Sequence, residues 1–231
     1  MTEIMNDIND HKRVNDILLG PLERPALKWL AAKAPAWVTP DICTLVGVFG
    51  VVFILIGYVL SNLNSGFLWL ASLGFVINWL GDSLDGTLAR YRKIERPKYG
   101  FYIDHIVDAG SEVLIFLGLG LTPHVSFIVA SLTLIAYLLL SVYVYVRTCV
   151  MGEFKISYGK LGPTEIRVLA ILLNISMFFG GDLSFTLNLG GLGKLTTNPY
   201  DLFVTFIGLL LLYFFSFNAA KDAVTLAKEN K

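Results

Sequence analysis

The sequence predicts an all-α integral membrane protein, a bundle of six transmembrane helices preceded by an N-terminal amphipathic helix at the membrane interface. Of the 231 residues, 55% are hydrophobic and only 16% are charged, and the mean hydropathy is +0.66. This composition is typical of integral membrane proteins. Apolar runs approach the length of about 20 residues needed to cross a bilayer, and they recur along the chain. The basic residues between these runs are distributed one-sidedly, which supports the same architecture.

The first 36 residues differ from the rest, and we expect a tail and juxtamembrane helix over 1–36 before a membrane domain over 37–231. Residues 1–11 are polar, show no signal-peptide pattern and are expected to form a loose tail. In residues 12–36, Leu, Trp and Ala recur near the helical period against Lys and Arg. The pattern indicates an amphipathic helix that lies in the membrane interface, packs on the domain, or does both.

Six apolar segments separated by polar turns follow. The first begins after Thr39-Pro40-Asp41, where either Thr39 or Asp41 is suited to cap a helix. The second and third segments carry acidic residues near one end. They can cross a membrane only if those ends lie at its surface or in a hydrated cavity. The predicted spans are residues 42–61, 66–88, 101–121, 125–146, 166–180 and 201–220.

The basic residues also predict the orientation. In a six-span arrangement every Lys and Arg except Lys194 lies on one side of the membrane. The positive-inside rule then places both termini and the loop between the second and third spans at the cytoplasmic face. Cys43 and Cys149 lie far apart in sequence near predicted cytoplasmic helix ends, so we expect free thiols. The formal net charge is zero, which gives no reason to expect a nucleic-acid partner.

Four aspartates near the cytoplasmic ends of the second and third spans form the candidate chemical centre. Asp82 and Asp85 are three residues apart and Asp104 and Asp108 are four apart, so each pair lies on one helix face. Neighbouring carboxylates repel one another unless cations compensate their charge. Hard oxygen ligands favour Mg²⁺ or Mn²⁺. The plainer interpretation is a set of salt bridges to the basic loop between the two spans.

Residues between the two pairs favour the metal interpretation. Gly86 lies one turn beyond Asp82, and Ala89 lies one turn beyond Asp85. Small side chains at these positions let a ligand approach the helix backbone. Arg90 follows, and its guanidinium is suited to a bidentate contact with a phosphate or diphosphate.

The run Asp82-x-x-Asp85-Gly86-x-x-Ala89-Arg90, followed by Gly100-x-x-x-Asp104-x-x-x-Asp108, resembles the signature of the CDP-alcohol phosphotransferase (CDP-alcohol phosphatidyltransferase) family. The loop between Arg90 and Gly100 is one residue longer than usual, which leaves roles for loop residues such as Arg96 open. The resemblance implies two divalent metal ions held by the four aspartates, with Asp108 also serving as general base. It also implies a homodimer. The nucleotide contacts that it implies are Asp41, Thr44, Asp82, Gly86, Ala89 and Arg90, although helix capping explains Asp41 equally well.

Basic residues at the fifth span are candidates for binding an anionic group. Pro163 and Thr164 fit a helix start. Lys160 and Arg167 would face the acidic centre, where they are suited to bind an acceptor phosphate. The alternative is ordinary positive-inside decoration.

Two other polar residues lie on the third span near the aspartates. His105 lies about 100° round the helix from Asp104, which favours packing or hydrogen bonding over metal ligation. Glu112 lies one turn past Asp108 and extends the acidic face into the membrane. There it is expected to bind a substrate hydroxyl or to pair with a base from another helix.

The predicted reaction is phospholipid synthesis, in which a phosphatidyl or other substituted phosphate group passes from a CDP-linked donor such as CDP-diacylglycerol to an acceptor hydroxyl, releasing CMP. An aminoalcohol phosphotransferase using CDP-choline or CDP-ethanolamine and diacylglycerol is an alternative, to which the Asp-His-x-x-Asp run points. Lys160 and Arg167 point instead to a phosphorylated acceptor.

Two other classes of membrane protein are alternatives to this transferase. The first is an intramembrane prenyltransferase, but such enzymes usually have more spans than the six predicted here. A cation-coupled transporter would not need Gly86-x-x-Ala89-Arg90, and the second half of the chain holds no matching acidic site.

Overall fold

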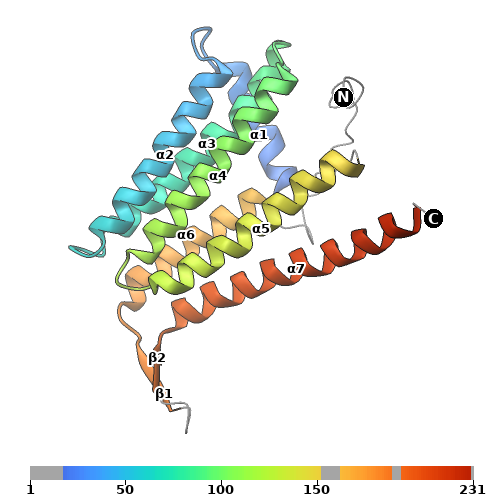
Figure 1. Ribbon diagram of the computed structural model, residues 1–231. Coiled ribbons are helices and arrows are strands. Elements are labelled where there is room, and N and C mark those ends of the chain that lie inside the picture. Colours follow the sequence, from blue (N-terminus) through green and yellow to red (C-terminus); the bar gives the residue numbers. More distant parts are fainter. Residues whose placement is uncertain (1–17, 152–161, 189–193, 230–231) are drawn as a thin grey trace.

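The computed structural model describes residues 18–151, 162–188 and 194–229, and over these residues it is a helical bundle with one short β-hairpin (Figure 1). The elements are α1 Gly20–Lys33, α2 Pro40–Leu60, α3 Phe67–Arg92, α4 Pro97–Gly120, α5 Phe127–Met151, α6 Pro163–Gly180, β1 Phe185–Asn188, β2 Lys194–Thr197 and α7 Pro199–Glu229. The predicted all-α membrane bundle is confirmed, and α2 to α7 coincide with the six predicted apolar segments to within a few residues, except that α7 continues well past the predicted sixth span.

Proline marks the first residue of α2, α4, α6 and α7. Its fixed φ suits a helix start, and its missing N–H is one that a helix start would leave unpaired anyway. Of the two candidate caps for α2, Thr39 is the one the structure uses, because its Oγ1 accepts a hydrogen bond from the Ile42 backbone N–H at 3.3 Å. Asp41 instead pairs with Arg96 across the start of α4.

Within the part of the chain that the structure describes, five helices are long and apolar enough to cross a membrane, namely α2, α3, α5, α6 and α7. The helix α4 is not among them, although its 24 residues would extend about 36 Å. It carries Asp104, Asp108 and Glu112 within its first two-thirds. The chain is therefore a multi-pass membrane protein, and the count of six spans stays a prediction that depends on a hydrated environment for α4.

Glycines let α2 and α3 approach each other closely. A Cβ atom added at Gly57 would lie 2.5 Å from the Ala71 backbone N, and one added at Gly74 would lie 2.6 Å from the Gly50 carbonyl oxygen. Real side chains do not tolerate such separations, so the two helices pack backbone to backbone, as is common in membrane bundles. This packing fixes the position of the α3 segment that carries Asp82 and Asp85.

The helix α1 packs on α3, which agrees with one of the two interpretations of the N-terminal amphipathic segment. Leu27 and Ala31 are buried on its inner face, whereas Leu22 and Trp29 are largely exposed. Those exposed apolar residues agree with a helix at a membrane interface, which stays a prediction. Residues 1–17 lie outside the described part of the chain.

The ends of the described chain lie toward one end of the bundle and the hairpin lies at the other (Figure 1). The hairpin pairs Phe185–Asn188 with Lys194–Thr197 in antiparallel register. Gly, Thr and Asn dominate the segment before Pro199, a composition typical of a loop. Cys43 and Cys149 are both free, as predicted.

Candidate active site

The four aspartates of the signature come from two neighbouring helices and line one polar cavity. Asp82 and Asp85 lie on α3, and Asp104 and Asp108 lie on α4. The cavity they share has a volume of about 440 Å³. Basic residues line it as well: Arg24, Lys28, Arg90 and Arg167. The predicted convergence of the two carboxylate pairs is thus present in the structure.

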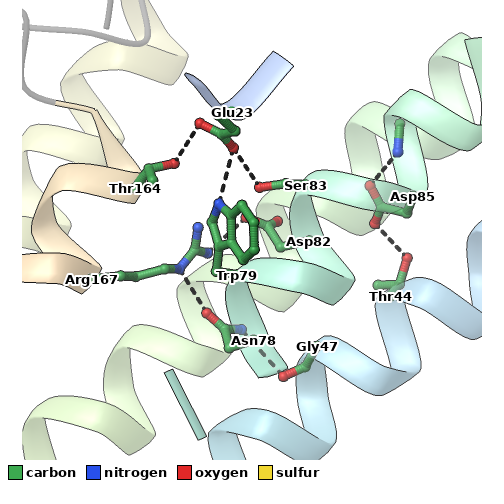
Figure 2. A network of polar contacts seen from close by, with 11 residues as sticks. Glu23, Thr44, Gly47, Asn78, Trp79, Asp82, Ser83, Asp85, Thr164 and Arg167 are labelled. Carbon is green, nitrogen blue, oxygen red and sulfur yellow. Dashed lines mark hydrogen bonds and ion pairs between the residues drawn. The ribbon is translucent and has the colours of Figure 1, made fainter. Parts of the chain in front are cut away.

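Asp82 is bound by a guanidinium from α6. Arg167 Nη2 donates to Asp82 Oδ2 at 2.7 Å, and Arg167 Nε donates to Asn78 Oδ1 at 2.8 Å (Figure 2). Asn78 is itself fixed, because its side-chain amide donates to the Gly47 carbonyl of α2 at 3.2 Å. The Arg167 side chain is only 14% exposed, and that of Asp82 is 27% exposed. This polar chain therefore ties α2, α3 and α6 together at the edge of the cavity.

Asp85 is held by donors from two sides. The Thr44 hydroxyl donates to Asp85 Oδ2 at 2.7 Å, and the Gly86 backbone N–H donates to Oδ1 at 2.5 Å (Figure 2). Asp85 is buried, and a buried carboxylate requires such partners. Thr44, expected as a nucleotide contact, thus lies against a signature aspartate.

Glu23 is a site residue that the sequence analysis missed. Its carboxylate on α1 accepts hydrogen bonds from Trp79 Nε1 at 3.1 Å, Ser83 Oγ at 2.9 Å and Thr164 Oγ1 at 3.0 Å (Figure 2). These bonds join α1 to α3 and α6 and place α1 as one wall of the polar cavity. In the sequence, only an acidic residue in the first turn of an amphipathic helix marked this position.

Asp108 occupies a junction between three cavities. It lines the polar cavity and also two cavities with mainly apolar walls, of about 150 and 190 Å³. We call these the first and second apolar cavities. The first is bounded by residues of α2 to α7, and the second by residues of α4 to α7. A hydrophilic substrate on one side and a lipid on the other can therefore both reach Asp108.

The donor set of the polar cavity fits divalent cations, although its side chains are not gathered around one point. Among the described residues, no group of three or more His, Cys, Asp or Glu side chains is arranged to hold a metal ion. Asp82 and Asp85 instead bind Arg167, Thr44 and Gly86. Carboxylate oxygens are nevertheless the ligands that Mg²⁺ and Mn²⁺ prefer. The Arg167 guanidinium that binds Asp82 also supplies positive charge beside the aspartates, where a cation is needed to balance their negative charge.

The other predicted contacts divide into two groups. Gly86 and Arg90 line the polar cavity, and Thr44 lines a small adjoining pocket together with Asp82, Asp104 and Asp108. Asp41 and Ala89 line none of the described cavities. Lys160 lies outside the described residues.

Two further residues of α4 have clear surroundings. The His105 ring contacts Phe101 and Tyr145, and its Nδ1 lies 2.6 Å from the Phe101 carbonyl oxygen. Those contacts agree with the predicted packing and hydrogen-bonding role, although the ring also reaches the polar cavity. Glu112 lines both apolar cavities.

Comparison with known proteins explains the arrangement. The sequence profile described as CDP-alcohol phosphatidyltransferase matches residues 37–195, more than half of the chain. The chain belongs to this family. The family resemblance drawn from the eight signature positions is thereby confirmed. Members of the CDP-alcohol phosphatidyltransferase family use divalent metal ions.

A curated relative supports the same assignment. The chain is 28% identical over 176 residues to a protein named cholinephosphotransferase 1 from Gallus gallus. The match covers 71% of this chain and 50% of that protein, so the chain spans about half the length of this relative. The profile match begins at residue 37, and α1 with Glu23 therefore lies outside the part that the CDP-alcohol phosphatidyltransferase family shares.

Proposed function

We propose that this membrane protein transfers a substituted phosphate group from a CDP-linked donor to an acceptor hydroxyl, with release of CMP. The observation that carries the proposal is the position of Asp108, where a cavity lined by four aspartates meets two apolar cavities. A water-soluble nucleotide and a membrane lipid must meet at such a point for this reaction. We place the polar cavity and both termini at the cytoplasmic face, because every basic residue except Lys194 would then follow the positive-inside rule.

Each signature residue has a proposed task. Asp82, Asp85, Asp104 and Asp108 would hold two Mg²⁺ or Mn²⁺ ions, which when bound neutralise charge on the diphosphate and on the leaving CMP. Thr44, Gly86 and Arg90 lie along the cavity, where they would contact the nucleotide part of the donor. Arg167 would bind an anionic oxygen of the substrate once Asp82 binds a metal ion in place of Arg167. Asp41, Ala89 and Lys160 remain part of the proposal on the signature alone.

Asp108 is the proposed general base. It takes the proton of the acceptor hydroxyl, the oxygen forms a bond to the β-phosphorus, and the bond from that phosphorus to the CMP oxygen breaks. Two features support this role, namely the access of Asp108 to all three cavities and its place one turn beyond Asp104. Homodimerisation remains a proposal from the family resemblance.

The test is CMP release by purified protein in lipid nanodiscs with Mg²⁺. CDP-diacylglycerol is supplied with glycerol phosphate, inositol phosphate, serine, choline or ethanolamine, and CDP-choline or CDP-ethanolamine is supplied with diacylglycerol. We expect release that depends on one donor and one acceptor. We also expect Asp108→Asn to lower it by at least about 100-fold, since general-base catalysis contributes about 10²–10⁴-fold. Full activity of a folded Asp108→Asn protein would refute the assigned base.

A specific observation favours the aminoalcohol alternative among the donors. The relative bears the name cholinephosphotransferase, and the Asp104-His105-x-x-Asp108 run is of the kind that the sequence analysis assigned to that branch. CDP-choline and CDP-ethanolamine are therefore the first donors to test. Ion flux in proteoliposomes without CMP release would instead support the transporter alternative.

A further inference from the structure

Glu112 lies beside two apolar cavities and holds one buried oxygen that has no hydrogen-bond partner among the described residues. That oxygen is Oε2. The Tyr137 hydroxyl of α5 supplies a side-chain hydrogen bond to the same carboxylate. Both residues line the first and the second apolar cavity. A buried polar atom without a partner is costly, so a carboxylate that lines a cavity and has such an atom favours a ligand that offers a hydrogen-bond donor.

The walls of these cavities define the rest of that ligand. Around Glu112 the first apolar cavity is lined by Phe75, Ile115, Leu119 and Leu173, and the second by Leu210 and Phe214. Hydrocarbon chains fit such walls, whereas a hydrated group does not. A lipid diphosphate would meet the negative charge of Glu112 and offers no hydrogen-bond donor to its carboxylate. An uncharged lipid with a free hydroxyl satisfies both conditions.

We propose that Glu112, oriented by Tyr137, is a docking site for the hydroxyl of an uncharged lipid alcohol that enters from the membrane side as the acceptor. The inference rests on the proposed function and names its acceptor class. Glu112 is four residues beyond Asp108 on α4, a rise of about 6 Å along the helix. The hydroxyl docks on the Glu112 carboxylate and then moves one turn along α4 to Asp108, where it reacts. Glu112 is accordingly a specificity-determining residue, and Asp108 remains the proton acceptor.

The first test measures binding, so it does not depend on turnover. Wild-type protein in nanodiscs is titrated with dioleoylglycerol and with the matched lipid in which the free hydroxyl is replaced by hydrogen. We expect the hydroxyl to improve wild-type binding by about tenfold, and we expect Glu112→Leu to abolish that preference. Glu112→Gln retains a carbonyl acceptor and should keep part of the preference for the lipid with the free hydroxyl. Tyr137→Phe should weaken this preference less than Glu112→Leu does. Equal binding of both lipids by the wild type would overturn the proposal, and so would preferential binding of a soluble choline compound.

The second test separates docking from chemistry. With the donor that supports CMP release, Glu112→Leu should raise the KM for the lipid alcohol about tenfold. The kcat and the KM for the donor should stay close to wild type. Ser131→Ala is the matched control, because Ser131 Oγ is also a buried unpaired atom but lines neither apolar cavity. A fall in kcat like that of Asp108→Asn would overturn the docking role, as would an unchanged KM. Absence of CMP release by the wild type would count against the proposed function and leave the binding test decisive.

Discussion

At the scale of single residues, the ion pair between Arg167 and Asp82 compensates part of the negative charge of the four aspartates. Arg167 forms two hydrogen bonds from different nitrogens, one to Asp82 and one to Asn78. A planar guanidinium makes both bonds at once, whereas a lysine ammonium is a compact point charge on a flexible stem. The side-chain type at this position therefore matters more than its charge.

Arg167→Lys should lower CMP release about tenfold or more while the protein stays folded. The reason is that a buried charge-assisted bond is worth roughly 1.5–3 kcal/mol. Arg147→Lys is a matched control, since Arg147 pairs with Asp222 at 2.9 Å with similar exposure and lines none of the described cavities. Initial rates and melting temperatures of both variants in the same nanodiscs provide the measurement. Equal activity of the two variants would show that the double contact of Arg167 has no catalytic importance.

At the scale of secondary-structure elements, α1 is attached to its neighbours through two carboxylates, Glu23 and Glu165. Glu23 accepts three hydrogen bonds from α3 and α6, and Glu165 of α6 accepts a fourth from the Leu19 backbone N–H at 2.8 Å. The helix α1 precedes residues 37–195, which the family profile matches, so the profile does not include this attachment. The attachment makes the wall of the polar cavity depend on Glu23.

Glu23→Gln should loosen α1 without unfolding the bundle. The amide lacks the negative charge that strengthens all three bonds, and the Thr164 hydroxyl could keep its contact only by turning to accept from the new NH2 group. We expect backbone amides of α1 to exchange hydrogen about tenfold faster or more, while those of α2 stay protected. Glu95→Gln is the control, since Glu95 is exposed in the connection between α3 and α4. Unchanged exchange in α1 would mean that Leu27 and Ala31 hold the helix without Glu23.

The close packing of α2 and α3 gives a second prediction at this scale. Gly74→Ala should destabilise the protein, because the new methyl group would lie 2.6 Å from the Gly50 carbonyl oxygen and 2.7 Å from the Ile54 backbone N. Overpacking of this kind costs about 1–3 kcal/mol. Gly110→Ala in α4 is the control, since its Cβ would meet no atom within 4 Å and alanine favours a helix. Thermal unfolding in one detergent should give a lower melting temperature for Gly74→Ala alone.

At the scale of the whole molecule, the sequence predicted what depends on local periodicity and missed what depends on contacts distant in sequence. The apolar runs gave the helices, and the three- and four-residue spacings placed Asp82, Asp85, Asp104 and Asp108 on facing surfaces. Glu23 could not be found in this way, because its partner Thr164 is 141 residues away. The partners of Arg167 are 85 and 89 residues away, so its contact with Asp82 in place of a substrate phosphate was equally hidden. The hairpin was missed because each of its strands has only four residues, so the alternation of Phe185-Thr186-Leu187-Asn188 is too short to distinguish a strand from a loop.

The six-span arrangement makes a prediction for the whole molecule. It depends on α4, the one long helix that is not apolar enough to be a membrane span by composition, because it carries Asp104, Asp108 and Glu112. If α4 crosses the membrane, the connection between α3 and α4 and the hairpin lie on opposite sides. If α4 stays at one surface, the number of crossings between these two points changes by one, and they lie on the same side.

Single cysteines report this directly in a background with Cys43→Ala and Cys149→Ala. Glu95→Cys lies in the connection between α3 and α4, and Ser184→Cys lies just before β1; both positions are exposed. In intact bacterial cells expressing each variant, we expect a membrane-impermeant maleimide to label Ser184→Cys at once and Glu95→Cys only after permeabilisation. That result requires an odd number of crossings between the two positions, which α4, α5 and α6 provide, and it places the Asp108 cavity at the cytoplasmic face. Labelling of both positions under the same condition would contradict the six-span arrangement and require α4 to lie along the surface.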